Sequence, residues 1–210
     1  PVGCKGNLIM MNTPTIPLHP AEAQILAKLP ENVRNQLRQL RMMVFDVDGV
    51  LTDGRLWYSA NGEEFKSFHA LDGHGLRMLG ESGIHVALIT GRESGIVSRR
   101  AAELGIPFVH QGVRDKIATL TQLAQENGLS LSEVGYMGDD LIDLPAMQRV
   151  GFSASVPEAP FYISQIASWV ATQPAGHGAV RECCDAILAS QGRLAAFITG
   201  GPLKTTGVIQ

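Results

Sequence analysis

Six short apolar runs alternate with helical patterns from residue 41 onward, and this alternation constrains the fold more than any other feature. The runs are Met42–Phe45, Val86–Ile89, Phe108–His110, Val134–Met137, Phe152–Ser155 and Trp169–Ala171. Helical spacing occupies the segments between them, over roughly 74–82, 93–104, 114–127, 140–149 and 178–190. Strands that are apolar along their whole length and alternate with helices predict a parallel sheet covered on both faces. We therefore expect an α/β fold.

The two ends of the chain carry other patterns. Residues 1–20 are rich in Pro, Thr and Asn without a sustained period, and we expect a mobile extension there. Residues 21–40 have apolar positions three and four apart, which predicts helix with a break at Pro30. We expect one domain over 21–192. The Gly- and Thr-rich residues 193–210 are expected to form a mobile tail, either a lid or a frayed end.

One segment interrupts the alternation. Residues 55–68 place strand-forming residues on both sides of Asn61-Gly62, which is a strong hairpin signal. The segment follows the first predicted strand, and ligands of open α/β sheets bind at the carboxyl ends of the strands. We therefore expect a β-hairpin flap beside the functional site.

Two carboxylates, Asp46 and Asp48, directly follow the first apolar run and precede Gly49. Burying such charges without partners is unfavourable by several kcal/mol each, so their position calls for a cation. A hard cation that prefers oxygen ligands suits this pair, and Mg²⁺ is the natural candidate.

The charge balance excludes several partners. Lys plus Arg number 17 and Asp plus Glu number 20, so the net charge is −3, which argues against a nucleic-acid groove or an acidic membrane surface. No apolar stretch approaches the roughly 20 residues of a membrane span. The three cysteines, Cys4, Cys183 and Cys184, form no disulfide framework, and we expect a reducing, cytoplasmic location.

Four motifs, in order, resemble those of the haloacid dehalogenase superfamily of phosphohydrolases over about residues 41–190. The stretch DVDGVLTDG from Asp46 resembles motif I, and Thr90 after the second apolar run resembles motif II. Lys116 before an amphipathic helix resembles motif III, and the run GDDLID at 138–143 resembles motif IV. The resemblance implies a Rossmann-like fold.

The resemblance also implies catalytic roles. Asp46 would attack the phosphorus to form an aspartyl-phosphate, and Asp48 would protonate the leaving oxygen and later deprotonate water. Thr90 would offer its hydroxyl to phosphate oxygens, together with neighbouring N–H groups such as that of Gly91. Lys116 would neutralise the developing charge and keep Asp46 ionised.

The same resemblance implies a set of Mg²⁺ ligands. Asp46, the backbone carbonyl of Asp48 and Asp139 would bind the ion, with Asp143 or Asp140 behind them. An Asp at the second position of motif I can activate water, whereas ion pumps of the superfamily carry Thr there. The sequence thus favours a phosphatase, with sugar mutases as an alternative.

Many members of the superfamily carry a separate cap domain, and the spacing here leaves no room for one. About 33 positions separate Asp53 from Val86, and about 26 separate Thr90 from Lys116, whereas a domain needs roughly 50 or more. We expect no cap domain, and a neighbouring subunit covering the site in its place. The hairpin would lie at that interface.

The capless pattern narrows the resemblance to the 3-deoxy-D-manno-octulosonate 8-phosphate (Kdo-8-phosphate) phosphatase family. The matching stretches are FDVDGVLTDG at 45–54, the flap, LDGHGLR at 71–77, GDDLIDLP at 138–145 and GAVRE at 178–182. The resemblance implies a Mg²⁺-dependent cytoplasmic homotetramer that hydrolyses a small acidic sugar phosphate in lipopolysaccharide precursor synthesis. One departure is His177, where the family usually has a basic residue between glycines; it is equally compatible with substrate contact and with a plain loop.

Substrate recognition is left open by these motifs. The carboxylate of an acidic sugar needs a cationic partner, and the candidates are Lys66, Arg77 and Arg92, although Arg77 could instead pair at an interface. Two alternatives remain: a phosphatase for another nonulosonate phosphate, and a catalytically silent tetramerisation module. The silent module predicts loss of motif residues, but Asp46, Asp48, Lys116 and Asp139 are all present.

Overall fold

The computed structural model describes residues 18–60, 62 and 64–200. Its centre is a six-stranded parallel sheet in the order β5-β4-β1-β6-β7-β8. The strands are β1 (Met42–Phe45), β4 (His85–Ile89), β5 (Phe108–His110), β6 (Val134–Met137), β7 (Phe152–Ser155) and β8 (Trp169–Val170). The predicted parallel sheet is confirmed, and each predicted apolar run lies in one of its strands, except that β8 ends one residue before the run predicted for it ends.

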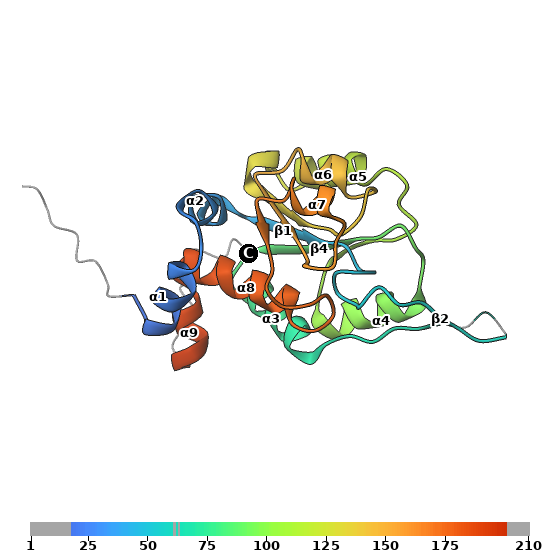
Figure 1. Ribbon diagram of the computed structural model, residues 1–210, viewed down its shortest axis with the longest axis horizontal. Coiled ribbons are helices and arrows are strands. Elements are labelled where there is room, and N and C mark those ends of the chain that lie inside the picture. Colours follow the sequence, from blue (N-terminus) through green and yellow to red (C-terminus); the bar gives the residue numbers. More distant parts are fainter. Residues whose placement is uncertain (1–17, 61, 63, 201–210) are drawn as a thin grey trace, which may run out of the picture.

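Helices cover both faces of this sheet, with α5, α6 and α7 on one side and α3, α4 and α8 on the other (Figure 1). The helices are α1 (Pro20–Ala27), α2 (Glu31–Gln39), α3 (Ala70–Glu81), α4 (Gly95–Leu104), α5 (Lys116–Glu126), α6 (Leu144–Met147), α7 (Phe161–Ser164), α8 (Ala179–Ser190) and α9 (Leu194–Thr199). A 3₁₀ turn spans Leu131–Glu133. None of the helices among the described residues is both long and apolar enough to cross a membrane.

Strand β1 shows why the apolar run is continuous. Met43 and Phe45 pack into the core that includes α3 and α8. Met42 and Val44 point to the other face and pack into the core that includes α5. All four side chains are fully buried, because a central parallel strand is covered on both faces.

The hairpin forms where residues 55–68 predict it. Strands β2 (Trp57–Tyr58) and β3 (Glu64–Phe65) pair antiparallel, with Trp57 opposite Phe65. Of the predicted two-residue turn, Asn61 lies outside the described residues, and Gly62 has the positive φ of 76° that favours glycine. The hairpin extends away from the body of the molecule (Figure 1).

The spacing argument against a cap domain agrees with the elements found. Between Asp53 and Val86 the described residues form the hairpin and α3, and between Thr90 and Lys116 they form α4 and β5. These intervals are filled by parts of the sheet and its covering helices, apart from the projecting hairpin.

The chain ends differ from the expectation at their inner boundaries. Helix α1 begins at Pro20 and is capped by His19, whereas residues 1–17 of the predicted extension lie outside the described residues. The predicted tail over 193–210 begins with helix α9, because Leu194 is buried and Phe197 packs against the main core. Its residues 201–210 lie outside the described residues.

A buried carboxylate joins these two ends. Glu22 of α1 accepts a hydrogen bond from the Ala195 N–H in the first turn of α9, at 2.9 Å, and its side chain also caps α1 through the His19 N–H. It satisfies backbone donors that a helix leaves unpaired at its start.

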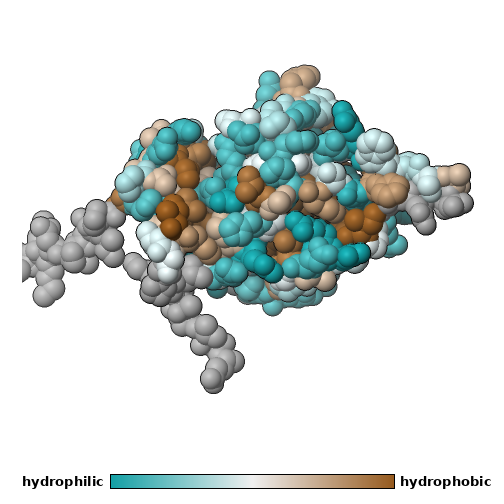
Figure 2. Space-filling view, turned by 90° about the horizontal axis from the view of Figure 1, so that it is seen from below, coloured by the Kyte–Doolittle hydropathy of each residue, from teal (hydrophilic) through white to brown (hydrophobic). Residues whose placement is uncertain are grey.

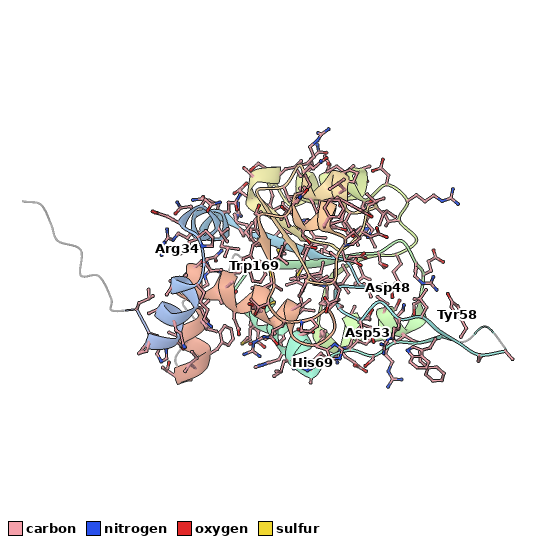
Figure 3. All side chains as sticks on the ribbon, viewed as in Figure 1. Arg34, Asp48, Asp53, Tyr58, His69 and Trp169 are labelled. Carbon is pink, nitrogen blue, oxygen red and sulfur yellow. The ribbon has the colours of Figure 1, made fainter. Side chains whose placement is uncertain are left out.

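The variant Glu22→Ala is therefore expected to lower the free energy of unfolding by about 1–2 kcal/mol, because it removes this cap from both helices. Catalytic turnover should be unchanged, since α1 lies on the other side of the sheet's length from Asp48 (Figure 1 and Figure 3). Denaturant unfolding of both proteins measures the difference. An unchanged midpoint would contradict a stabilising role for Glu22.

Candidate active site

The motif residues meet at the carboxyl edge of the sheet. Asp46 directly follows β1, Thr90 directly follows β4, and Asp139 lies two residues after β6. These three strands are neighbours in the sheet, so residues far apart in the sequence lie side by side. They line a cavity of about 440 Å³ together with Asp48, Gly54, Leu56, Gly91, Arg92, Lys116, Asp140 and Ile142.

Lys116 lies between two buried carboxylates. Its Nζ is 2.9 Å from Asp46 Oδ2 and 2.6 Å from Asp143 Oδ1. Burial opposes the charge on Lys116, but the two carboxylates outweigh it and raise the lysine pKa. The ammonium is thus held in its charged form beside Asp46.

Asp143 has no exposed surface and is saturated with hydrogen bonds. Its Oδ1 accepts from Lys116 and from the Tyr136 hydroxyl, each at 2.6 Å. Its Oδ2 accepts from the backbone N–H groups of Asp139 and Asp140, at 3.0 and 3.2 Å. This carboxylate therefore fixes Lys116 and the Asp139 loop from behind and does not line the cavity.

Tyr136 is a site residue that sequence reasoning missed. It lies in the apolar run of β6 with its side chain fully buried, and burial together with the charge of Asp143 raises its hydroxyl pKa well above the usual value. The hydroxyl is a neutral donor to Asp143. No sequence signal separates it from an ordinary core residue of the strand.

The hydrogen bonds of residues 138–143 explain why the helix after β6 is shorter than predicted. The helix expected over about 140–149 is reduced to α6 over Leu144–Met147. The preceding residues form a turn instead, because the Asp143 side chain takes the N–H groups of Asp139 and Asp140.

Two glycines make room for the carboxylates. A Cβ at Gly49 would lie 2.1 Å from Asp139 Oδ2, and the φ of +88° at Gly49 is one that other residues rarely adopt. A Cβ at Gly138 would lie 2.5 Å from the Asp143 Cβ. Neither position tolerates a side chain without moving the acidic cluster.

The acidic cluster has the composition of a Mg²⁺ site. Oxygen atoms of Asp46, Asp139 and Asp143 lie within 4.8 Å of one another. No hydrogen bond or ion pair among the described residues involves the Asp139 carboxylate, and the charge of Lys116 only partly offsets that of the neighbouring carboxylates. Because Asp143 is saturated, Asp46 and Asp139 are the side chains with oxygens suited to the ion, which fits hard, oxygen-ligated Mg²⁺.

The acids of this cluster resist ionisation in the absence of a cation. Burial and then the charge of Asp46 raise the pKa of Asp139 to about 8. Burial and then the charge of Asp143 raise the pKa of Asp46 to about 7, although Lys116 acts in the opposite direction. Three carboxylates surround one ammonium, so a divalent cation would restore the charge balance.

Asp48 faces two cations at the mouth of the cavity. Lys66 Nζ, directly after β3, is 2.5 Å from its Oδ1, and Arg92 Nε is 3.8 Å from its Oδ2. Figure 3 shows Asp48 at the side of the sheet from which the hairpin extends. Two of the three cationic candidates therefore lie at the site, and both contact Asp48.

Thr90 and Gly91 line the same cavity. Thr90 is buried, its N–H donates to the His110 carbonyl at 2.9 Å, and its carbonyl accepts from Val113 N–H at 3.1 Å, so the backbone is fixed between β4 and β5. The tightly held strand end places Thr90 in the cavity that Asp46 and Lys116 also line.

Arg77 is not part of this cavity, and its prediction as a substrate-binding residue is corrected. It lies on α3, donates to the Glu103 carbonyl of α4 at 3.3 Å, and lines a hollow at the opposite end of β4 with His85 and Pro107. Arg77 therefore lies away from the carboxyl edge of the sheet.

His177 contacts its own loop. Its Nδ1 lies 2.9 Å from the Ala175 carbonyl oxygen.

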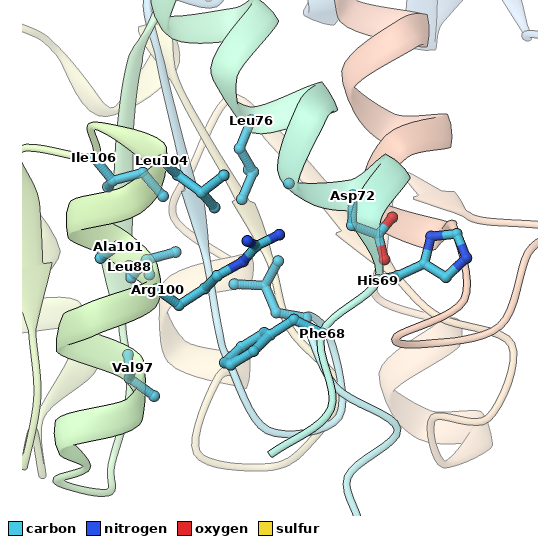
Figure 4. Close-up of a pocket in the computed structure, with 12 residues that line it drawn as sticks. Phe68, His69, Asp72, Leu76, Leu88, Val97, Arg100, Ala101, Leu104 and Ile106 are labelled. Atoms are coloured by element: carbon cyan, nitrogen blue, oxygen red, sulfur yellow. The ribbon is translucent and has the colours of Figure 1, made fainter.

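An enclosed hollow between α3 and α4 is a separate feature (Figure 4). It is lined mainly by apolar side chains, together with Arg100, Asp72 and His69, and its volume of about 10 Å³ is at the lower limit for one water molecule. It contains none of the predicted catalytic or metal-binding residues and is too small for a sugar phosphate, so it is a packing defect rather than a candidate site.

The chain resembles proteins of known function. Residues 106–182 match the haloacid dehalogenase-like hydrolase family. The chain is 41% identical over 174 residues to the 3-deoxy-D-manno-octulosonate 8-phosphate phosphatase of Haemophilus influenzae, covering 82% of this chain and 97% of that protein. The same phosphatase of Escherichia coli K12 is 41% identical over 175 residues, covering 83% and 89%.

A solved structure extends the similarity to three dimensions. The 3-deoxy-D-manno-octulosonate 8-phosphate phosphatase of Moraxella catarrhalis, in complex with a magnesium ion, a phosphate ion and KDO, superposes with a TM-score of 0.80. It is 41% identical, and the match covers 82% of this chain and 99% of that chain.

The raised pKa values predict how stability depends on pH. The carboxyls of Asp46 and Asp139 bind protons up to about pH 7 and 8 in the folded chain, but only to about pH 4 when unfolded. Folding is therefore favoured at low pH, and without metal the free energy of unfolding falls as pH rises from about 4 to 8.

In Asp139→Asn, we expect the free energy of unfolding to fall less between about pH 4 and 8, because one of the two carboxyls of the acidic cluster with a raised pKa is absent. Mg²⁺ at about pH 8 should raise the melting temperature of the parent protein but not of the variant. Calorimetry with chelator and with Mg²⁺, at about pH 5 and pH 8, measures both effects. Equal pH dependence of the free energy of unfolding in the two proteins would show that folding does not raise the pKa of Asp139.

Proposed function

The chain belongs to the 3-deoxy-D-manno-octulosonate 8-phosphate phosphatase family of haloacid dehalogenase-like hydrolases, and on this basis we propose that it hydrolyses Kdo-8-phosphate to Kdo and phosphate. The observation that carries the proposal is the meeting of Asp46, Lys116 and Asp139 in one cavity at the carboxyl edge of the sheet. This arrangement provides a nucleophile, a fixed positive charge and an oxygen ligand for Mg²⁺.

In the first half of the proposed reaction, a carboxylate oxygen of Asp46 forms a bond to phosphorus, and the bond from phosphorus to the sugar oxygen breaks. Asp48 gives a proton to that leaving oxygen, so that Kdo departs as an alcohol. Lys116, 2.9 Å from Asp46, stabilises the negative charge that gathers on the phosphoryl oxygens.

In the second half, water attacks the phosphorus of the aspartyl-phosphate. Asp48 takes a proton from the water, the bond between phosphorus and the Asp46 oxygen breaks, and inorganic phosphate leaves. The Asp46 carboxylate and the protonated Asp48 are thereby restored for another cycle.

Asp46, Asp139 and the Asp48 carbonyl would hold Mg²⁺, with Asp143 fixing the loop behind them. When bound, the ion supplies positive charge that screens the approach of a carboxylate to an anionic phosphate. Thr90 and the N–H of Gly91 would bind phosphate oxygens beside it.

We assign recognition of the substrate carboxylate to Arg92 and Lys66. Arg92 lines the cavity, the Lys66 side chain is buried next to it, and both pair with the carboxylate of Asp48. A guanidinium matches a carboxylate through two parallel hydrogen bonds.

We also propose a cytoplasmic homotetramer in which the hairpin packs against a neighbouring copy. Trp57 and Phe65 are a cross-strand pair with 56% and 66% of their surfaces exposed, and Leu56 beside them is 43% exposed. Apolar surface gathers at the hairpin end of the molecule (Figure 2). Exposed aromatic pairs of this kind favour an interface, which would also cover the open cavity.

Phosphate release from Kdo-8-phosphate in the presence of Mg²⁺ tests the function. The parent chain should turn this substrate over in preference to a panel of other sugar phosphates, including a nonulosonate 9-phosphate. Asp46→Asn should reduce kcat by at least about 10³-fold, because the amide is a poor nucleophile. A chelator should abolish turnover.

Asp185→Asn is the matched control, since Asp185 lies on α8 and pairs with Arg181 outside the cavity. Its turnover should equal that of the parent chain. Preference for another acidic sugar phosphate would move the substrate while keeping the mechanism. No metal-dependent turnover of any phosphoester would refute the phosphatase and favour a silent assembly module.

The assembly is tested by Trp57→Asp combined with Phe65→Asp. Two charges on the hairpin face should reduce the molar mass in light scattering from that of four chains to that of one, because unpaired charges are unfavourable in an apolar interface. Phe161→Asp, at an exposed aromatic of α7, serves as control and should leave the mass unchanged. A single-chain mass for the parent protein would contradict the tetramer.

A further inference from the structure

Tyr58 connects the hairpin to the mouth of the cavity. Its hydroxyl accepts a hydrogen bond from Arg92 Nη2 at 2.6 Å, and the Arg92 guanidinium carbon lies 5.8 Å from the centre of its ring. The two residues are 34 positions apart and lie on different elements, Tyr58 in β2 and Arg92 in the loop between β4 and α4. Tyr58 lies in the flap at 55–68 but in none of the four catalytic motifs.

The Arg92 guanidinium is thereby placed between two groups. On one side its Nε lies 3.8 Å from Asp48 Oδ2, and on the other its Nη2 donates to Tyr58. An arginine side chain of a loop loses substantial conformational freedom when it is ordered. A contact that orders this side chain in the free protein reduces the conformational entropy that is lost when a ligand binds.

The chemistry of the phenol suits this purpose. A carboxylate at the position of Tyr58 would neutralise the guanidinium and compete with an anionic ligand, whereas a phenol hydroxyl accepts a hydrogen bond and remains neutral. The ring adds a cation–π contact that also preserves the charge. Arg92 also lines the cavity, where its planar guanidinium matches the geometry of a carboxylate.

Packing does not account for Tyr58. Its side chain is 61% exposed, so it contributes little to the core. The second arm of the hairpin makes a parallel contact, since Lys66 pairs with Asp48. The hairpin thus touches the rest of the site through polar contacts with the residues that face the substrate.

We propose that Tyr58 is a positioning residue that holds Arg92 ready for the carboxylate of an acidic sugar phosphate, and so determines the preference for acidic over neutral phosphoesters. The proposal rests on the proposed function. Tyr58 acts on binding of the carboxylate and not on the phosphoryl chemistry, because it touches Arg92 but none of Asp46, Lys116 or Asp139 among its described contacts.

Tyr58→Phe tests the proposal because it removes the hydrogen-bond acceptor and keeps the ring. For Kdo-8-phosphate we expect KM to rise about three- to tenfold with kcat changed less than about twofold. For p-nitrophenyl phosphate, which lacks a carboxylate, both parameters should be unchanged. Tyr162→Phe, which removes a hydroxyl from α7 outside the cavity, is the matched control and should change neither substrate's kinetics.

A double-mutant cycle tests the route through Arg92. In an Arg92→Ala background, Tyr58→Phe should have no further effect on KM, because its partner is absent. Tyr58→Gln, which restores an acceptor without the ring, should recover part of the affinity.

The outcomes distinguish the positioning role of Tyr58 from the proposed phosphatase function. Equal changes for both substrates, or an undiminished effect in the Arg92→Ala background, would overturn the positioning role. Unchanged KM for Kdo-8-phosphate in Tyr58→Phe would overturn it as well. Failure of the parent chain to hydrolyse Kdo-8-phosphate would instead refute the proposed function.

Discussion

The placement of the Lys116 ammonium between the carboxylates of Asp46 and Asp143 is the interaction on which the rest of the site depends. It binds the start of α5 to the end of β1 and to the turn after β6. Asp143 extends the connection through Tyr136 and two backbone N–H groups. Buried charges are tolerated only when paired and hydrogen-bonded, so these contacts tie the strand ends together.

That network still leaves an excess of negative charge. The carboxylates of Asp46 and Asp143 lie close to Asp139, and Gly49 and Gly138 permit these carboxylates to come close together. The chain therefore folds into an arrangement that is electrostatically unfavourable without a cation, as the raised pKa values of Asp46 and Asp139 reflect. The acidic cluster thus lowers the stability of the folded chain when no metal is bound, and such a loss of stability is common at functional sites.

The hairpin also positions side chains at the site. Its aromatic residues Trp57 and Phe65 face outward, while Tyr58 and Lys66 reach Arg92 and Asp48. Alternation of side chains along a strand makes this division possible, because neighbours point to opposite faces. A short hairpin can thus offer an apolar face to a partner and polar groups to the cavity, in a chain whose described residues form no separate domain over the site.

The sequence by itself determined the parallel sheet, its helical layers and the meeting of Asp46, Thr90, Lys116 and Asp139, because strand periodicity is local and parallel strands end at one edge. Tertiary structure alone decided which partners the side chains have. Arg92 reaches Asp48 and Tyr58, Arg77 turns to α4, Tyr136 supports Asp143, and α9 packs where a tail was expected. These outcomes depend on distances between elements far apart in the chain, which no local pattern encodes.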